Sequence, residues 1–407
     1  MKTGLQIVVF IIVAGSILFH AGQAYGQAGI DMELSAEYEF GQQIMFTAKL
    51  SSPVQIQSAA IFIFDGLQGI TYTQPVAFDA NGISQYRFDT SQSSLRPFTT
   101  MLWRYEFTLA NGTTVQSTTM SIRYDDNRFP WRVREGNGLR IHWYEGDDQF
   151  SASALNAGQA GLDSINSFFP IDLSRPVDVY IYASTSDLRG TLAGSESWVA
   201  GHADSPAGVV MVTIEPGVEQ NILMEQRIPH ELMHVMLYRQ VGDGYKNIPA
   251  WLREGTAVLA EVYPNPEYDR FLMDAAGRDA LIPMLDLCAS FSPNSDSAFL
   301  AYAQSRSFTN YLRGLYGSDV LVNLANIYAS GVNCERGIER AFGVSLTKLE
   351  RDWHVNALGQ NNITSALANF APYLALLCLV ILFPLIGILN SMRKKGNPHG
   401  PETYAKR

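Results

Sequence analysis

In the amino-terminal part of the chain, apolar and polar residues alternate in short runs, and this alternation predicts β-strands. The expected strands are 44–50, 59–64, 85–88 and 101–109. Asn81-Gly82 and Asn111-Gly112 separate such runs, and these dipeptides favour tight hairpins. We therefore predict an antiparallel β-sandwich of immunoglobulin-like type over residues 27–125, with no chemistry of its own.

From residue 138 the pattern changes to alternating strands and helices. Strands are expected at 139–144 and 177–182, with a helix at 152–168 between them. Further helices are expected at 221–238 and from 250 to about 263, and the chain reads as mainly helical to about 358. Pro229 marks either a first turn or a kink. The pattern predicts a mixed α+β domain over residues 126–360.

Both ends of the chain carry apolar runs that do not belong to these domains. Residues 5–19 are apolar, follow Met1-Lys2, and precede the small residues Ala24 and Gly26. This order is typical of a signal peptide, assigned to residues 1–26; an uncleaved amino-terminal anchor is the alternative.

Near the other end, residues 370–389 form an uncharged run that is long enough to cross a membrane as a helix. Arg393-Lys394-Lys395 follows it, and basic residues stay on the cytoplasmic side. We predict a linker at 361–369, a single transmembrane helix at 370–391 and a cytoplasmic tail at 392–407. The body of the chain would then lie outside the cell membrane. A buried hairpin of a soluble protein is the alternative.

Composition narrows the classes of partner. A net charge of −10 leaves no basic patch for nucleic acid. Of the three cysteines, Cys378 lies in the apolar run, and Cys288 and Cys334 can pair or stay free in an exported protein. His142, His202 and His354 lack the spacing of metal ligands and are interpreted as structural, with a cleft role for His202 as the alternative.

The residues with the clearest chemistry are His230-Glu231-Leu232-Met233-His234. Two histidines four apart on a helix face the same way and can bind one zinc ion. A catalytic zinc keeps a fourth position open for water, which Glu231 can deprotonate. Glu254 follows His234 after nineteen residues, within Trp251-Leu252-Arg253-Glu254-Gly255, and is the predicted third ligand.

This arrangement resembles the gluzincin zinc metallopeptidases, the clan of thermolysin and the M1 aminopeptidases, and is closest to its peptidase-MA-like members. The resemblance covers about residues 139–360. The family's pattern Trp-Leu-x-Glu-Gly-x-Ala-x-x-x-Glu is matched at the positions Trp251, Leu252, Glu254, Gly255, Ala257 and Glu261. It implies a Zn²⁺ cofactor held by His230, His234 and Glu254.

Two further roles follow from the resemblance. Glu261 lies seven residues after Glu254, nearly two helical turns, and would accept the second ring proton of a liganding histidine; a surface ion pair is the alternative. Tyr302 matches the family's catalytic tyrosine, which stabilises an oxyanion. The Lys-Gly pair that follows this tyrosine in M1 enzymes is absent here, and an ordinary helix tyrosine is the alternative.

Residues 208–214 are expected to form the strand that lines the cleft. They lack the Gly-x-Met-Glu-Asn segment with which M1 aminopeptidases capture a substrate amino terminus. A strand can still bind an extended peptide through its backbone. We therefore favour a membrane-anchored, extracytoplasmic endopeptidase that acts on peptides or proteins. The alternative is an inactive binding or adhesion protein at the cell surface, and the oligomeric state stays open.

Overall fold

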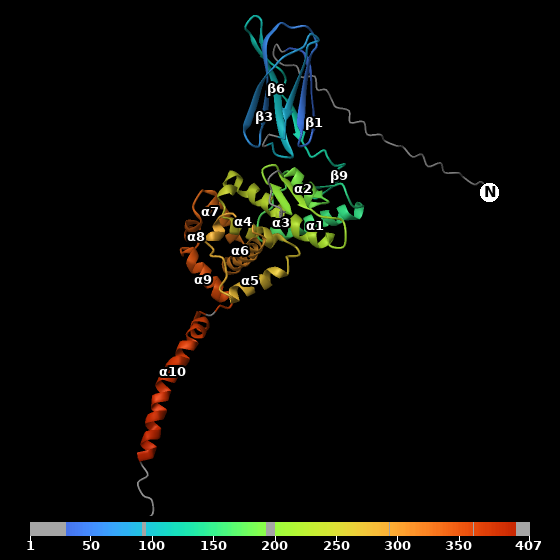
Figure 1. Cartoon of the computed structure of the whole chain (residues 1–407). Helices are drawn as coiled ribbons and strands as arrows, with labels where there is room; N and C mark the ends of the chain where they lie inside the picture. Colours follow the sequence, from blue (N-terminus) through green and yellow to red (C-terminus); the bar gives the residue numbers. More distant parts are fainter. Residues whose placement is uncertain (1–29, 92–94, 193–199, 293, 361, 396–407) are drawn as a thin grey trace, which may run out of the picture. The chain divides into compact units, whose positions relative to one another are not determined.

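A computed structural model describes residues 30–91, 95–192, 200–292, 294–360 and 362–395 (Figure 1). The predicted signal peptide and most of the predicted tail lie outside the described residues. The chain contains two compact units. The first runs to Arg132 and includes the segment 186–194, and the second comprises the remainder.

The first unit is built from two antiparallel sheets, one with the order β1-β2-β5 and one with the order β4-β3-β6-β7, in which β8 also pairs with β6. The strands are β1 Met32–Glu39, β2 Gln43–Leu50, β3 Ile56–Asp65, β4 Ile70–Val76, β5 Ile83–Asp89, β6 Thr99–Leu109, β7 Thr114–Gln116 and β8 Met120–Tyr124. Alternate residues of β6 are buried, as the period of two in its sequence predicts.

The two sheets share one core. Phe46 of β2 packs against Trp103 of β6 with ring centroids 5.0 Å apart, and Tyr72 of β4 packs against Phe88 of β5. Large aromatic residues from both sheets therefore exclude water from the space between them. The β-rich unit is confirmed, and its immunoglobulin-like type stays a prediction.

Only one of the two predicted hairpins forms. Asn111-Gly112 joins β6 to β7, which pair with each other, and Gly112 has a φ of 80° that suits glycine. Asn81-Gly82 instead connects β4 to β5, which belong to different sheets. Its turn is held by Asp79, whose carboxylate accepts hydrogen bonds from the backbone N–H groups of Asn81 and Ile83. The dipeptide indicated a turn correctly but could not indicate its partner strand.

The second unit contains a five-stranded sheet with the order β12-β13-β11-β10-β9. The strands are β9 Arg132–Gly136, β10 Leu139–Trp143, β11 Val177–Tyr182, β12 Gly201–Asp204 and β13 Val209–Thr213. Strand β11 runs parallel to both β10 and β13, whereas β12 is antiparallel to β13. Every residue of β11 and β13 is buried.

Helices make up most of the rest of this unit (Figure 1). They are α1 Asp148–Asn166, α3 Gln220–Val241, α4 Ala250–Ala260, α5 Glu267–Gly277, α6 Ser295–Tyr316, α7 Asp319–Ala329, α8 Cys334–Phe342 and α9 Leu346–Asn356; α2, Thr185–Thr191, groups with the first unit. Of these helices, α1 and α3 are the ones that pack on the sheet. Helix α1 starts earlier than predicted because the Asp147 side chain caps it by accepting from the Phe150 N–H. Helix α4 ends at Ala260, before the predicted end near 263.

Small residues let the helices that carry the candidate site approach closely. A Cβ atom added at Gly161 of α1 would lie 2.7 Å from the Pro229 side chain of α3. One added at Gly255 of α4 would lie 2.2 Å from Thr309 Oγ1 of α6. Neither helix pair could keep this distance with a larger residue. The glycine that follows Glu254 therefore fits α4 against the helix that carries Tyr302.

Cys288 and Cys334 form a disulfide, with Cα atoms 6.0 Å apart. It closes a loop with a sequence separation of 46 residues, which restricts the unfolded chain. Changing both cysteines to serine is expected to lower the free energy of unfolding by about 2–4 kcal/mol. The measurement is the Tm of the full-length protein in detergent, with the wild type under oxidising and reducing conditions as the matched pair. Equal Tm values in all three samples would contradict a stabilising role.

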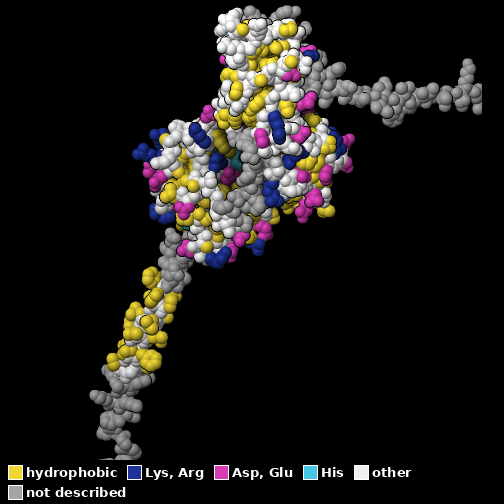
Figure 2. Space-filling view, turned by 45° about the horizontal axis from the view of Figure 1, so that its top comes forward, with side chains coloured by type: hydrophobic (Ala, Val, Ile, Leu, Met, Phe, Trp, Pro, Cys, Tyr) yellow, Lys and Arg dark blue, Asp and Glu magenta, His cyan; other side chains and the backbone are white. Residues whose placement is uncertain are grey.

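The last described element is the helix α10, Asn362–Lys395, so most of the predicted linker is helical. Residues Phe370–Leu389 within it are long and apolar enough to cross a membrane, and none of that span is buried. Hydrophobic side chains cover the middle part of this helix in the space-filling view (Figure 2). A helix that exposes so much apolar surface fits a hydrocarbon environment.

Candidate metal centre

Helix α3 brings three of the predicted residues to one place. His230 and His234 are four residues apart, and four residues are slightly more than one turn, so both rings lie on one side of α3. Their ring centroids are 5.2 Å apart. Glu231, also on α3, is buried with 8% of its surface exposed.

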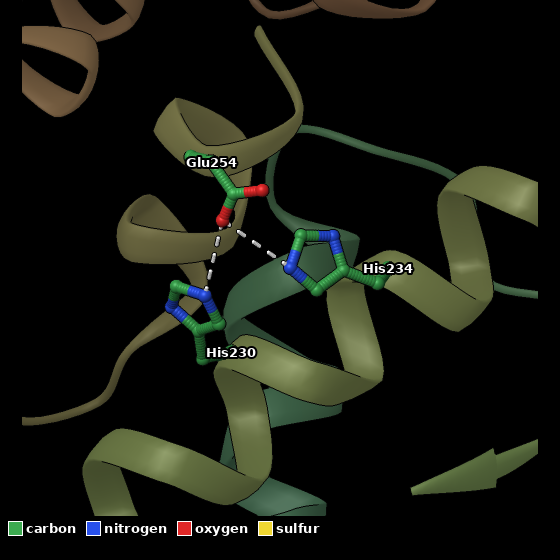
Figure 3. Close-up of side chains that lie close together, drawn as sticks. All are labelled: His230, His234 and Glu254. Carbon is green, nitrogen blue, oxygen red and sulfur yellow. Dashed lines mark ion pairs between the residues drawn. The ribbon is translucent and has the colours of Figure 1, made fainter. Parts of the chain in front are cut away.

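Glu254 of α4 completes a group of three donors (Figure 3). Its Oε2 atom lies 3.5 Å from Nε2 of His230 and 3.5 Å from Nε2 of His234. Ligand atoms about 2.1 Å from a tetrahedral zinc lie roughly 3.4 Å from one another. Two imidazole nitrogens and one carboxylate oxygen at this spacing fit a catalytic zinc with one position left for solvent or substrate.

Each histidine is also held through its other ring nitrogen. Nδ1 of His230 lies 3.1 Å from Oε1 of Glu261, and Nδ1 of His234 lies 3.1 Å from the hydroxyl of Tyr245. These contacts leave both Nε2 atoms directed at Glu254. Glu261 was predicted for this role from the family resemblance. Tyr245 was missed, because a tyrosine in the 3-10 turn Gly242–Asn247 belongs to no motif.

Glu261 reaches His230 by a different route from the one predicted. It is not on the helical face shared with Glu254, because α4 ends at Ala260 and the backbone of Glu261 is no longer helical, with ψ 126°. Pro229, which lies inside α3, accounts for its position. Proline has no N–H, so the Glu225 carbonyl one turn earlier lacks its helical donor and accepts a 2.9 Å hydrogen bond from Val262 N–H instead. That bond anchors the residue next to Glu261.

The charges at the centre are strongly coupled. Burial alone would raise the pKa of Glu254, but the imidazoles of His234 and His230 outweigh it and lower the pKa well below the usual range. Burial would lower the pKa of His230, but its hydrogen bonds to Glu254 and Glu261 raise it. Three carboxylates around two imidazoles thus attract positive charge. A divalent cation would balance the negative charge of these carboxylates and displace the protons from the imidazole nitrogens.

Tyr302 lies beside the three donors. Its ring centroid is 6.0 Å from that of His230, and Phe291 packs against it from another side. Burial raises the pKa of Tyr302, so the phenol keeps its proton at neutral pH. Within the described residues its hydroxyl has no hydrogen-bond partner, which leaves this donor for a bound molecule.

These side chains line a cleft with a volume of about 570 Å³. Histidine and acidic side chains are visible within a hollow of the surface (Figure 2). The lining residues are Ala200, Gly201, His202, Gln226, Arg227, His230, Glu231, His234, Glu254, Glu261, Asn265, Tyr268, Ala298, Phe299 and Tyr302. All six predicted site residues are therefore brought together in one cleft.

The cleft strand is β12 rather than the strand predicted at 208–214. Strand β13, which occupies that region, has β11 on one side and β12 on the other, so its backbone groups are already paired. In the described part of the chain β12 pairs only with β13. Gly201 of β12 lies close to the Glu231 side chain, since an added Cβ atom would clash with Oε1 of Glu231.

The remaining histidines have different positions. His142 contacts Asp178 at 2.7 Å through Nε2 and stacks on Tyr180, which agrees with a structural role. His354 lies on α9, and burial lowers its pKa. His202 is exposed on β12 and lines the cleft, where the alternative prediction of a cleft role would place it.

Comparison with known families agrees with this geometry. Residues 157–359 match the model of the peptidase MA superfamily. The match contains α3, α4 and α6 and all six residues of the predicted site. It supports a peptidase-MA-like fold for the second unit and suggests peptidase activity.

Other comparisons add little. No curated protein matches the chain. Among solved structures, a myokine shows 6% identity and a TM-score of 0.20, with 24% of this chain and 97% of the myokine covered. Wild-type OgpA from Akkermansia muciniphila shows 16% identity and a TM-score of 0.19, with 25% of this chain and 30% of OgpA covered. TM-scores this low do not define a shared fold.

Proposed function

We propose that this protein is a zinc-dependent peptidase of gluzincin type. The observation that carries the proposal is the group His230, His234 and Glu254, with Glu231 in the same cleft. A third ligand supplied by a second helix distinguishes this arrangement from a chance occurrence of the histidine motif. The match to the peptidase MA superfamily supports the reaction class.

Zinc, when bound by these three residues, acts as a Lewis acid on water and on the scissile carbonyl. Glu231 accepts the proton of the attacking water and then delivers it to the leaving amine. Its carboxylate is buried, faces the cleft and lies against Gly201. A base held in this way needs little reorganisation when the proton moves.

Tyr302 has the donor that the reaction requires at the oxyanion. As water attacks, the carbonyl oxygen gains negative charge, and a phenol O–H directed at it stabilises the transition state more than the substrate. The assignment is supported by the position of the Tyr302 ring beside His230 and by its hydroxyl, which has no hydrogen-bond partner among the described residues.

A peptide can bind along β12. Among the described residues β12 pairs only with β13, so its other edge has backbone N–H and C=O groups beside Glu231 with which an extended peptide can pair as an added strand. Backbone pairing places no demand on a free amino terminus. This supports an endopeptidase over an aminopeptidase. No observation favours the inactive binding protein, since Glu231 and all three donors are in place.

Tyr302→Phe is expected to lower kcat by about 10²–10³, because removing one oxyanion donor typically has this effect. KM and zinc content should change little, since the ring and its packing against Phe291 remain. The measurement is steady-state hydrolysis of a quenched fluorescent peptide, with Tyr311→Phe on the same helix as the control. An unchanged kcat would remove Tyr302 from the mechanism.

We also propose that α10 anchors the protein in the cell membrane, with the cleft outside and the tail in the cytoplasm. The apolar span and the following Arg393-Lys394-Lys395 support this orientation. Protease added to intact cells is expected to digest the second unit but to spare a tag at the carboxyl end. Protection of the second unit, with digestion only after lysis, would contradict the orientation.

A further inference from the structure

One cation in the cleft has no part in the mechanism above. Arg227 lies on α3, three residues before His230, so it occupies the same side of the helix one turn away. It lines the cleft together with Glu231 and His230. It is partly buried, whereas most arginines keep the guanidinium in water.

The guanidinium has donors to spare. One nitrogen, Nη1, donates to the backbone carbonyl of Thr213, and this is its only polar partner among the residues that the structure describes. A guanidinium carries five N–H donors. Glu231 lies four residues after Arg227 on α3, but the two side chains do not form an ion pair in the described part of the chain. Burial lowers the pKa of Arg227, and no neighbouring carboxylate offsets this effect.

The place of Arg227 along the cleft strand follows from its partner. Thr213 donates its backbone N–H to the carbonyl of Ala200, the residue before β12, so Arg227 lies near the start of this strand. Glu231 lies against the next residue, Gly201. Residues on a strand are spaced by about 3.4 Å, so a peptide along β12 would place a neighbour of the scissile bond near Arg227.

We propose that Arg227 is a specificity-determining residue that binds a carboxylate of the substrate next to the scissile bond. The carboxylate belongs either to an acidic side chain or to the carboxyl terminus of a peptide. A peptide antiparallel to β12 has the residues on the carboxyl-terminal side of the scissile bond near Ala200. An acidic side chain or a terminal carboxylate can therefore reach Arg227. A planar guanidinium with free donors matches a carboxylate in a bidentate manner. The inference rests on the proposed zinc peptidase function, because the zinc site defines where along β12 the scissile bond of the peptide lies.

The test uses three hydroxamates that chelate zinc and carry one residue each: glutamate amide, glutamine with a free carboxyl end, and glutamine amide. They have nearly the same shape and differ in the presence and place of one negative charge. The full-length zinc-loaded protein in detergent should bind one or both charged probes about 10- to 100-fold more tightly than the neutral probe. The preferred probe identifies the source of the carboxylate.

Variants separate recognition from folding and from general electrostatics. Arg227→Gln should remove the preference for charge, and Arg227→Lys should retain part of it as a point charge. Arg278→Gln, which removes an exposed cation directly after α5 and outside the cleft, should leave the preference unchanged. Zinc content and Tm are measured for each variant. Because Arg227→Lys keeps the positive charge, this variant tests the assignment even where Arg227→Gln impairs folding.

The outcomes are distinct for the two proposals. If the protein holds zinc and all three probes bind alike, or if Arg227→Gln keeps the preference, the assignment of Arg227 is wrong and the peptidase proposal stands. If the protein takes up no zinc, the proposed function fails and this inference fails with it. Hydrolysis is not required, since binding alone is measured.

Discussion

Glu231→Gln is expected to lower the rate of peptide hydrolysis by about 10²–10⁴ while zinc content and Tm stay near those of the wild type. Glutamine has nearly the same size as glutamate, so it fits against Gly201, but it cannot accept the proton of the attacking water. Hydrolysis of a broad peptide library, followed by mass spectrometry, measures the change.

Glu225→Gln is the matched control, because Glu225 lies on the same helix and its side chain does not line the cleft. It should hydrolyse the library as the wild type does. Equal activity of wild type and Glu231→Gln would exclude the proposed base. A wild-type protein that holds zinc but cleaves nothing in the library would favour a narrow substrate range or an inactive fold, and capture of cell-surface proteins by Glu231→Gln would separate these two.

The second large effect is expected at the metal ligands. Glu254→Ala leaves two of the three donors, and the double variant His230→Ala, His234→Ala leaves one. Both should lose zinc, from about one ion per chain to nearly none, because so few donors do not retain the ion against a chelator. Because zinc binds only the folded protein, its loss also lowers the free energy of unfolding, by about 4 kcal/mol where the zinc concentration exceeds the Kd a thousandfold. Elemental analysis and Tm measure the two effects.

Glu261→Gln provides a graded comparison in the same experiment. It keeps all three ligands and changes only the partner of His230 Nδ1, so zinc affinity should fall by about 10- to 100-fold without complete loss. Competition with a fluorescent chelator resolves this difference. If Glu254→Ala binds zinc as tightly as Glu261→Gln, then Glu254 is not a ligand.

Much of the candidate centre was predictable because its spacing is local. Two histidines four residues apart can face one ion in a helix of any fold. The Trp-Leu-x-Glu-Gly pattern located Glu254, and both Trp251 and Gly255 are now seen in the packing that holds α4 in place. The strand at 177–182 was predicted in full because all of its residues except Asp178 are β-branched or aromatic, and such residues favour strands.

Other predictions failed where the answer depended on a distant partner. The cleft strand was placed at 208–214, but an apolar run cannot show whether its edges are covered, and β12 covers one edge of β13. The turn at Asn81-Gly82 was taken for a hairpin, although β4 and β5 pair with strands of different sheets. The end of α4 was placed too late, since the period of a helix continues past the point where Val262 bonds to α3.

The sequence by itself determined which residues are candidate donors, which residue is the proposed base and where the apolar segment near the carboxyl end lies, because each depends on residue type and on spacing along a helix. Only the tertiary structure decided that Tyr245 supports His234, that Pro229 frees the carbonyl that anchors Glu261, and that Arg227 enters the cleft. These contacts join residues on different elements, and their free energies depend on how the helices and the sheet pack. No local pattern records that packing, so no reading of the chain alone could supply it.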